Sequence, residues 1–105
     1  MVLEIYEITK KFPKEETFGL VSQIRRAVIS ITSNIAEGFS RSSYADKSRF
    51  YSMALGSLTE VQNQLIIAKD LRYINKEEFD VLIKKSVIIH KLLNGLIKKS
   101  KSFNS

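Results

Sequence analysis

His90 is the only imidazole in the chain, and a histidine can act as a general base or a metal ligand near neutral pH. It follows Ser86 by four residues on an apolar stripe, and no acid stands next to it in the sequence. That setting is more typical of a packed core histidine than of a catalytic base. A di-iron bundle needs Glu-x-x-His motifs, and here Val87 stands at the position of the glutamate.

Other catalytic and cofactor patterns are missing from the sequence. The chain has no cysteine, which excludes disulfides, thiolate metal sites and a cysteine nucleophile. Its four glycines are isolated and form no phosphate-binding loop. We therefore predict a non-enzymatic protein with no catalytic residues, no metal and no cofactor.

Basic residues gather at the C-terminal end of the chain. The formal net charge is +6, and residues 81–105 hold six lysines and no acid. Three of these lysines recur every seven residues and predict one outward helix face. That face could contact nucleic-acid phosphates by charge alone, or it could be a solvated helix surface; both interpretations stay open. The candidate nucleic-acid-binding residues are Lys84, Lys85, Lys91, Lys98, Lys99 and Lys101.

A second polar group surrounds the predicted junction between the second and third helices. Its mixed charges favour Arg–carboxylate pairs that fix helix packing or a subunit contact, with a ligand site as the alternative. Small residues nearby, Ser30, Ser33, Gly56 and Ser57, predict a close approach of helices. The polar cluster comprises Arg25, Arg26, Asn34, Glu37, Arg41, Arg49 and Glu60.

The apolar residues recur at helical spacing throughout, so the predicted fold class is all-α. We expect a single domain over residues 1–105, an antiparallel up-and-down four-helix bundle whose first helix is shortened. The helices are predicted at about 2–12, 16–37, 43–72 and 76–99.

Local chemistry predicts how these helices begin and end. Pro13 should close the first helix, because the residue before a proline resists α conformation. Gly38 should follow the second as a left-handed C′ residue, while Ser43 and Asn75 should cap the third and fourth. The side chains of the fourth helix expected to point inward are Phe79, Leu82, Ile83, Val87, His90, Leu93 and Ile97.

No apolar run reaches the roughly 18 to 20 residues that a membrane span needs, and the N-terminal residues do not form a secretory signal. We therefore expect a soluble, cytoplasmic protein. The third helix has a wide apolar sector that one neighbouring helix would not cover, which favours oligomerisation.

Several motifs along nearly the whole chain resemble one family. They include the SNIAEG run at 33–38, FPKEE at 12–16, QIRRA at 23–27, ALGSL at 54–58 and LLNGLI at 92–97. With these motifs the sequence resembles the four-helix-bundle proteins encoded in intervening sequences of bacterial 23S rRNA genes. Relatives of that family include the accessory variability determinant of diversity-generating retroelements.

The resemblance implies a four-helix bundle, assembly into a homopentamer and no enzymatic activity. For the retroelement relative it implies a basic surface that binds nucleic acid and a reverse transcriptase. The opening segment, residues 2–6, resembles the later half of the family's first helix. Two functional interpretations follow: an oligomeric bundle that binds RNA or DNA backbone through its lysines, or a homo-oligomeric scaffold that acts through protein contacts only.

Overall fold

A computed structural model describes residues 1–103, which contain four α-helices, one short 3-10 helix and no β-strand. The predicted all-α, four-helix fold is confirmed. The first helix is by far the shortest, with 8 residues against 21 to 27 in the others. In chain order the elements are α1 (Val2–Thr9), η1 (Lys14–Glu16), α2 (Leu20–Ser40), α3 (Tyr44–Asp70) and α4 (Lys76–Ser102).

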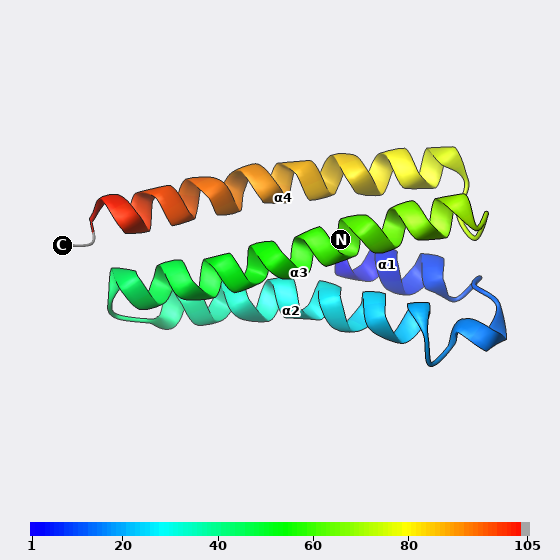
Figure 1. Cartoon of the computed structure of the whole chain (residues 1–105), viewed down its shortest axis with the longest axis horizontal. Helices are drawn as coiled ribbons and strands as arrows, with labels where there is room; N and C mark the ends of the chain where they lie inside the picture. Colours follow the sequence, from blue (N-terminus) through cyan, green and yellow to red (C-terminus); the bar gives the residue numbers. More distant parts are fainter. Residues whose placement is uncertain (104–105) are drawn as a thin grey trace.

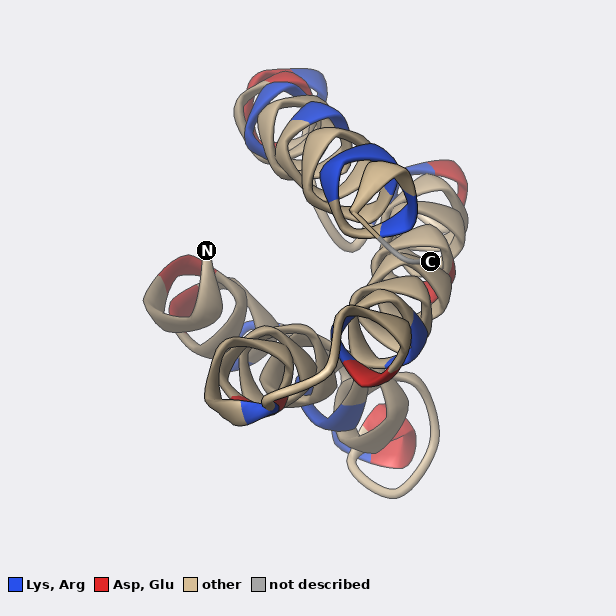
Figure 2. Cartoon of the chain, turned by 90° about the vertical axis from the view of Figure 1, so that its left-hand side faces the viewer, with Lys and Arg blue, Asp and Glu red and all other residues tan. Residues whose placement is uncertain are grey.

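The helices run up and down along one long axis (Figure 1). α3 packs against both α2 and α4, while α1 packs mainly against α2. In an end-on view the ribbons of α1, where the N-terminus lies, and α4 do not lie side by side (Figure 2). The molecule is elongated, with principal extents of 49 × 24 × 18 Å. It is thus a bundle whose fourth position is only partly filled.

The connection between α1 and α2 differs from the sequence-based expectation. The chain leaves α1 at Thr9, because Lys11 and Phe12 form tighter turns in which their N–H groups donate to Ile8 and Thr9. After Pro13, Lys14–Glu16 form η1, which includes Glu16, the residue at which the second helix was expected to begin. α2 begins only at Leu20, with Gly19 as its N-cap.

The predicted caps of α3 and α4 are confirmed. The Ser43 hydroxyl accepts a hydrogen bond from the Asp46 N–H at 3.1 Å. At α4, the Asn75 side chain accepts from the Glu78 N–H at 2.8 Å, and the Glu78 carboxylate accepts from the Asn75 N–H at 3.0 Å. These reciprocal bonds form a capping box and satisfy backbone donors that the helix start leaves without partners. Just before it, Arg72 turns the chain with a φ of 66°.

The predicted end of α2 is wrong. Gly38 has no positive φ, and the helix continues through it to Ser40. The reason for a glycine at this position is contact with a neighbour, because a Cβ at residue 38 would overlap the ring of Tyr51 on α3. The expectation for Gly56 is also wrong, since a Cβ there would meet only open space. Between α2 and α3 the close approach also involves Ser57, whose hydroxyl donates to that of Ser30 at 2.9 Å.

The buried side of α4 is rotated slightly from the predicted one. Its fully buried residues include Ser86, whereas Val87, predicted to point inward, is 41% exposed and His90 is half-buried. Small hydroxyl side chains occupy core positions seven residues from Leu93 on either side, which masks the apolar repeat in the sequence. The buried residues of α4 are Leu82, Ser86, Leu93 and Ser100.

Candidate nucleic-acid interface

The six candidate lysines all lie on α4 and are all exposed. Figure 2 shows basic residues along this helix, including the end that faces the viewer. Lys84, Lys91 and Lys98 follow one another at two-turn intervals and so form a stripe on the side away from the buried residues of α4. We call these three residues the lysine stripe.

The charges of the lysine stripe are not neutralised by neighbours. Within residues 1–103, none of its three side chains forms an ion pair, and neither does Lys99 or Lys101. Lys85 differs, because its ammonium group pairs with the Glu4 carboxylate of α1. α4 also carries no acid after Asp80. Its C-terminal two thirds therefore present uncompensated positive charge to solvent, with no aromatic side chain interleaved in the stripe.

The polar cluster at the α2–α3 junction is separated into small local groups. The Arg26 guanidinium donates to Glu60 at 2.7 Å and links α2 to α3, and Gln64 donates to the same carboxylate at 3.2 Å. Arg41, the residue that follows α2, pairs at 3.0 Å with Glu37 in the last turn of that helix. All of these groups lie at or near the surface, apart from Gln64, which is buried.

The other contacts of the cluster are mostly of other kinds, although Arg49 also pairs with Asp46 at 3.8 Å within α3. Arg41 and Arg49 both stack on Phe50, each guanidinium carbon lying 4.6 Å from the ring centroid. The Asn34 side chain donates to the Ser30 carbonyl at 2.9 Å and to its hydroxyl at 3.1 Å. These contacts link adjacent turns and helices, and they do not converge on a shared cavity.

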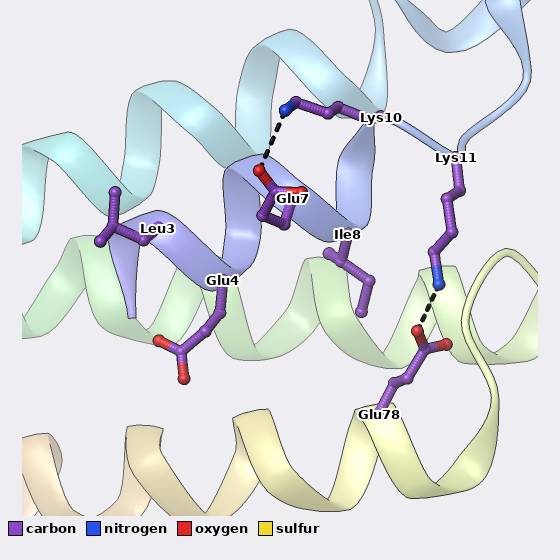
Figure 3. Close-up of a pocket in the computed structure, with 7 residues that line it drawn as sticks. All are labelled: Leu3, Glu4, Glu7, Ile8, Lys10, Lys11 and Glu78. Atoms are coloured by element: carbon purple, nitrogen blue, oxygen red, sulfur yellow. Dashed lines mark hydrogen bonds and ion pairs between the residues drawn. The ribbon is translucent and has the colours of Figure 1, made fainter.

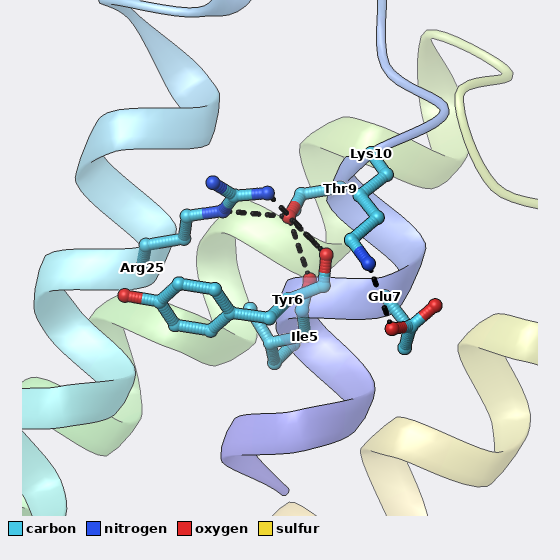
Figure 4. Close-up of polar contacts among 6 residues, drawn as sticks. All are labelled: Ile5, Tyr6, Glu7, Thr9, Lys10 and Arg25. Atoms are coloured by element: carbon cyan, nitrogen blue, oxygen red, sulfur yellow. Dashed lines mark hydrogen bonds and ion pairs between the residues drawn. The ribbon is translucent and has the colours of Figure 1, made fainter.

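Arg25 stands apart from the cluster and holds α1 in place (Figure 4). Its Nε donates to the Thr9 hydroxyl at 2.9 Å, and its Nη2 donates to the Tyr6 carbonyl at 3.3 Å. The guanidinium carbon also lies 4.6 Å from the centroid of the Tyr6 ring. Sequence analysis placed Arg25 among Arg–carboxylate pairs, but its partners are a hydroxyl, a carbonyl and an aromatic ring.

A hollow between α1 and the start of α4 combines an apolar base with charged edges (Figure 3). Leu3 and Ile8 supply apolar surface, while Lys11 reaches across to form an ion pair with Glu78. The hydrogen bond from Lys11, followed by that from the Asn75 N–H, lowers the pKa of the Glu78 carboxyl below its usual value, against a smaller opposing effect of burial. The arrangement fastens α1 to α4.

Three further features bear on the site. His90 makes no side-chain hydrogen bond within residues 1–103. In the same part of the chain, no cluster of three or more His, Asp or Glu side chains is placed to hold a metal ion. None of the helices described is both long and apolar enough to cross a membrane.

Sequence reasoning missed two polar contacts that hold the helices together. One is the bond from Arg25 to Thr9, and the other joins Gln62 on α3 to the buried Ser86 hydroxyl at 3.0 Å. Both connect residues far apart in the chain, so no local spacing identifies them. The polar residue within the apolar stripe at position 86 was the one available indication.

The architecture and surface define a small all-α bundle with a basic outer helix. A family model described as 23S rRNA-intervening sequence protein matches residues 1–95. The chain belongs to this family. The match ends before Lys98, so the family region contains Lys84 and Lys91 but not the last member of the lysine stripe.

A solved structure resembles the whole bundle. It is the crystal structure of a protein of unknown function from the S23 ribosomal protein family of Bacteroides thetaiotaomicron VPI-5482. The TM-score is 0.82 at 28% sequence identity, and the alignment covers 92% of this chain and 88% of that one. No curated protein matches the chain.

Proposed function

We propose that this protein is a non-enzymatic, cytoplasmic, oligomeric helical bundle that binds nucleic-acid backbone through the lysine-rich face of α4. The observation that carries the proposal is the lysine stripe, where exposed ammonium groups lie on one helix face with no carboxylate to neutralise them. Lysines spaced along a rigid helix can contact successive phosphates and release condensed counterions. With no aromatic side chain to stack on bases, such binding would be tolerant of sequence.

Oligomerisation would strengthen weak phosphate contacts. The family resemblance implies a homopentamer, and a ring of identical stripes would raise the apparent affinity for any nucleic acid long enough to reach several subunits. The chain has a mass of 12.0 kDa, so a homopentamer predicts a particle five times as heavy in sedimentation equilibrium. A monomer at micromolar concentration would contradict this part of the proposal.

The test is a salt titration of binding. We would measure the affinity of the protein for a labelled structured RNA and a labelled DNA duplex over a series of salt concentrations. The proposal predicts a logarithmic slope of about −0.7 to −0.9 for each phosphate contacted. It also predicts that the triple variant Lys84→Glu, Lys91→Glu, Lys98→Glu loses binding while it keeps its oligomeric mass.

A matched variant tests whether nucleic-acid binding depends on the lysine stripe or only on the net charge of the protein. Lys10→Glu, Lys14→Glu, Lys76→Glu lowers the net charge by the same amount, and all three residues are exposed near the end of the molecule where α4 begins. Lys10 and Lys76 each form a surface ion pair within their own helical turn. It should bind much more tightly than the stripe variant. Equal losses in the two variants would mean that charge acts without a defined surface, and no binding at low salt would refute the proposal.

A second candidate function is a scaffold that acts through protein contacts alone. Exposed apolar residues on several helices favour it, including Ile88 and Leu92 on α4 and Met53 on α3. For the retroelement relative, the resemblance implies a reverse transcriptase as protein partner. If the protein is only a scaffold, neither the wild type nor the triple variant of the lysine stripe should bind nucleic acid, and the two should assemble alike.

A further inference from the structure

One five-residue motif occurs twice in α4. The sequence LIKKS stands at 82–86 and again at 96–100, and both copies lie within the helix. Each residue of the first copy precedes its counterpart by 14 residues, which is close to four helical turns, so the copies lie on the same face about 21 Å apart. In both copies the serine is buried and the two lysines are exposed. The repeat therefore presents two equivalent pairs of ammonium groups along one side of α4.

The two lysines of each pair stand on either side of an uncharged line of residues. Neighbouring residues on a helix point about 100° apart, so the lysines of a pair diverge. Val81, Ile88 and Gly95 recur every seven residues, and each stands three or four residues from both lysines of a pair. Val81 is 53% exposed and Ile88 is 66% exposed, while a Cβ on Gly95 would meet open space. We call these three residues the α4 ridge.

The α4 ridge points away from the protein core. The buried residues Ser86 and Leu93 each stand two positions before a ridge residue, which places them about 160° around the helix from it. α4 packs mainly against α3 and lies at the edge of the bundle, with basic residues along it (Figure 2). The ridge and the lysines beside it therefore form a convex surface that a large ligand can reach.

The dimensions of this surface match the major groove of B-form DNA. An α-helix with its side chains is about 10 to 12 Å across, and that groove is about 12 Å wide. A helix in the groove with the α4 ridge toward the base pairs would direct the diverging lysines to the two backbones that border the groove. The apolar ridge would then meet base edges, including thymine methyl groups.

Other nucleic acids fit this surface less well. The major groove of an A-form RNA helix is deep and narrow, and side chains cannot read it. Proteins bind single strands largely through aromatic side chains on which the bases stack, and residues 81–102 contain no phenylalanine, tyrosine or tryptophan. Shape and charge together therefore favour a DNA duplex.

We propose that α4 enters the major groove of B-form DNA, with the α4 ridge toward the base pairs and the lysine pairs toward the two phosphate backbones. This inference rests on the proposed function, which it narrows from nucleic acid in general to a DNA duplex. The two LIKKS copies contribute unequally, because Lys85 is paired with Glu4 of α1, whereas Lys99 forms no ion pair within residues 1–103. The C-terminal copy should therefore make the stronger phosphate contacts.

Duplexes that differ in their grooves test this inference. The first probe is a labelled DNA duplex of about 20 base pairs, which is about two helical turns. The second is an RNA duplex of the same sequence. The third is the same DNA with glucosylated 5-hydroxymethylcytosine, because a substituent at this ring position fills the major groove and leaves the phosphates free. Affinities for the full-length protein would be measured by fluorescence anisotropy at one salt concentration.

We expect the DNA duplex to bind at least about tenfold more tightly than the RNA duplex, and the glucosylated DNA to lose most of that advantage. Gly95→Leu should weaken binding of the DNA duplex about tenfold, because the larger side chain holds the helix away from the base pairs. It should leave binding of the RNA duplex unchanged. Gly56→Leu on α3 is the matched control, since both glycines lie within helices and both have open space at the Cβ position.

The outcomes separate this inference from the proposed function. Equal affinities for the DNA and RNA duplexes would overturn the major-groove contact and leave backbone binding standing. Unchanged affinity for the glucosylated DNA would do the same, as would equal affinities of Gly95→Leu and Gly56→Leu for the DNA duplex. No binding to any of the three probes at low salt would refute the proposed function, and this inference with it.

Discussion

The ring of Tyr51 lies directly against the backbone of Gly38, where α2 and α3 come close together. Tyr51 is almost fully buried, and its other neighbour is Phe39, whose ring centroid is 5.9 Å away in an edge-on arrangement. Burial raises the pKa of the Tyr51 phenol above its usual value. The contact fixes the separation of α2 and α3 near the turn that joins them.

Gly38→Ala should therefore destabilise the protein, although alanine is the better helix former. The added methyl group would overlap the Tyr51 ring, and overpacking of this kind costs about 1 to 3 kcal/mol. Gly56→Ala is the matched control: it has open space around it, so it should raise the free energy of unfolding by up to about 1 kcal/mol. Urea denaturation of both variants measures the difference, and two variants of equal stability would contradict the contact.

The two glycines illustrate what the sequence could and could not predict. Helix number, fold class and the caps at Ser43 and Asn75 depend on residues close together in the chain, and all were predicted. The contact of Gly38 depends on which residue of α3 lies opposite, and no local pattern contains that information. In the same way, the polar cluster could be listed from the sequence, but its division into separate pairs depends on the packing of α2 against α3.

Arg25→Ala should loosen α1 from the bundle. The variant loses the hydrogen bonds to the Thr9 hydroxyl and the Tyr6 carbonyl, together with the stacking on the Tyr6 ring. Hydrogen bonds made by a charged group contribute about 1.5 to 3 kcal/mol, so we expect a loss in that range. Amide hydrogen exchange in α1 should be faster in the variant than in the wild type, while exchange in α3 should be the same in both.

Arg26→Ala provides the comparison for Arg25→Ala. Arg26 is the next residue, and its ion pair with Glu60 is at the surface, with 64% of the Arg26 side chain exposed. Surface ion pairs contribute about 0 to 1 kcal/mol, so this variant should change stability little and should leave exchange in α1 unchanged. Faster exchange in α1 in both variants would mean that charge on α2, rather than the contacts of Arg25, holds α1.

Acid should weaken the attachment between α1 and α4 at Glu78. Its pKa is lowered in the folded protein, mainly by the hydrogen bond from Lys11, so the folded state holds the Glu78 proton less tightly than the unfolded state does. The resulting stabilisation is complete above the unfolded pKa of about 4.3 and is lost as the pH falls through the lower folded pKa. Denaturation curves between neutral pH and acid should show this loss.

Glu78→Gln should remove this part of the acid dependence. At neutral pH the variant should be less stable than the wild type, and the two should converge as the pH falls. Glu77→Gln is the control, because the neighbouring Glu77 forms no ion pair within residues 1–103. If Glu78→Gln retained the full acid-dependent loss of the wild type, the attachment would have another origin.

The last prediction concerns Ser86, a hydroxyl in the core between α3 and α4. Its side chain is fully buried, accepts a hydrogen bond from the Gln62 amide at 3.0 Å and donates to the Ile83 carbonyl at 2.7 Å. Ser86→Ala removes the acceptor and leaves the half-buried Gln62 amide without it, so stability should fall by about 1 kcal/mol. Ser52→Ala, at an exposed position of α3, should have little effect.

A double-mutant cycle with Gln62→Leu separates the hydrogen bond from the size of the side chain. If the bond accounts for the loss, Ser86→Ala should cost less in a Gln62→Leu background, because no donor is then left unpaired. The expected coupling is about 0.5 to 1.5 kcal/mol. Additive effects would mean that Ser86 is favoured at this position by its volume alone and that α4 packs on α3 without help from this bond.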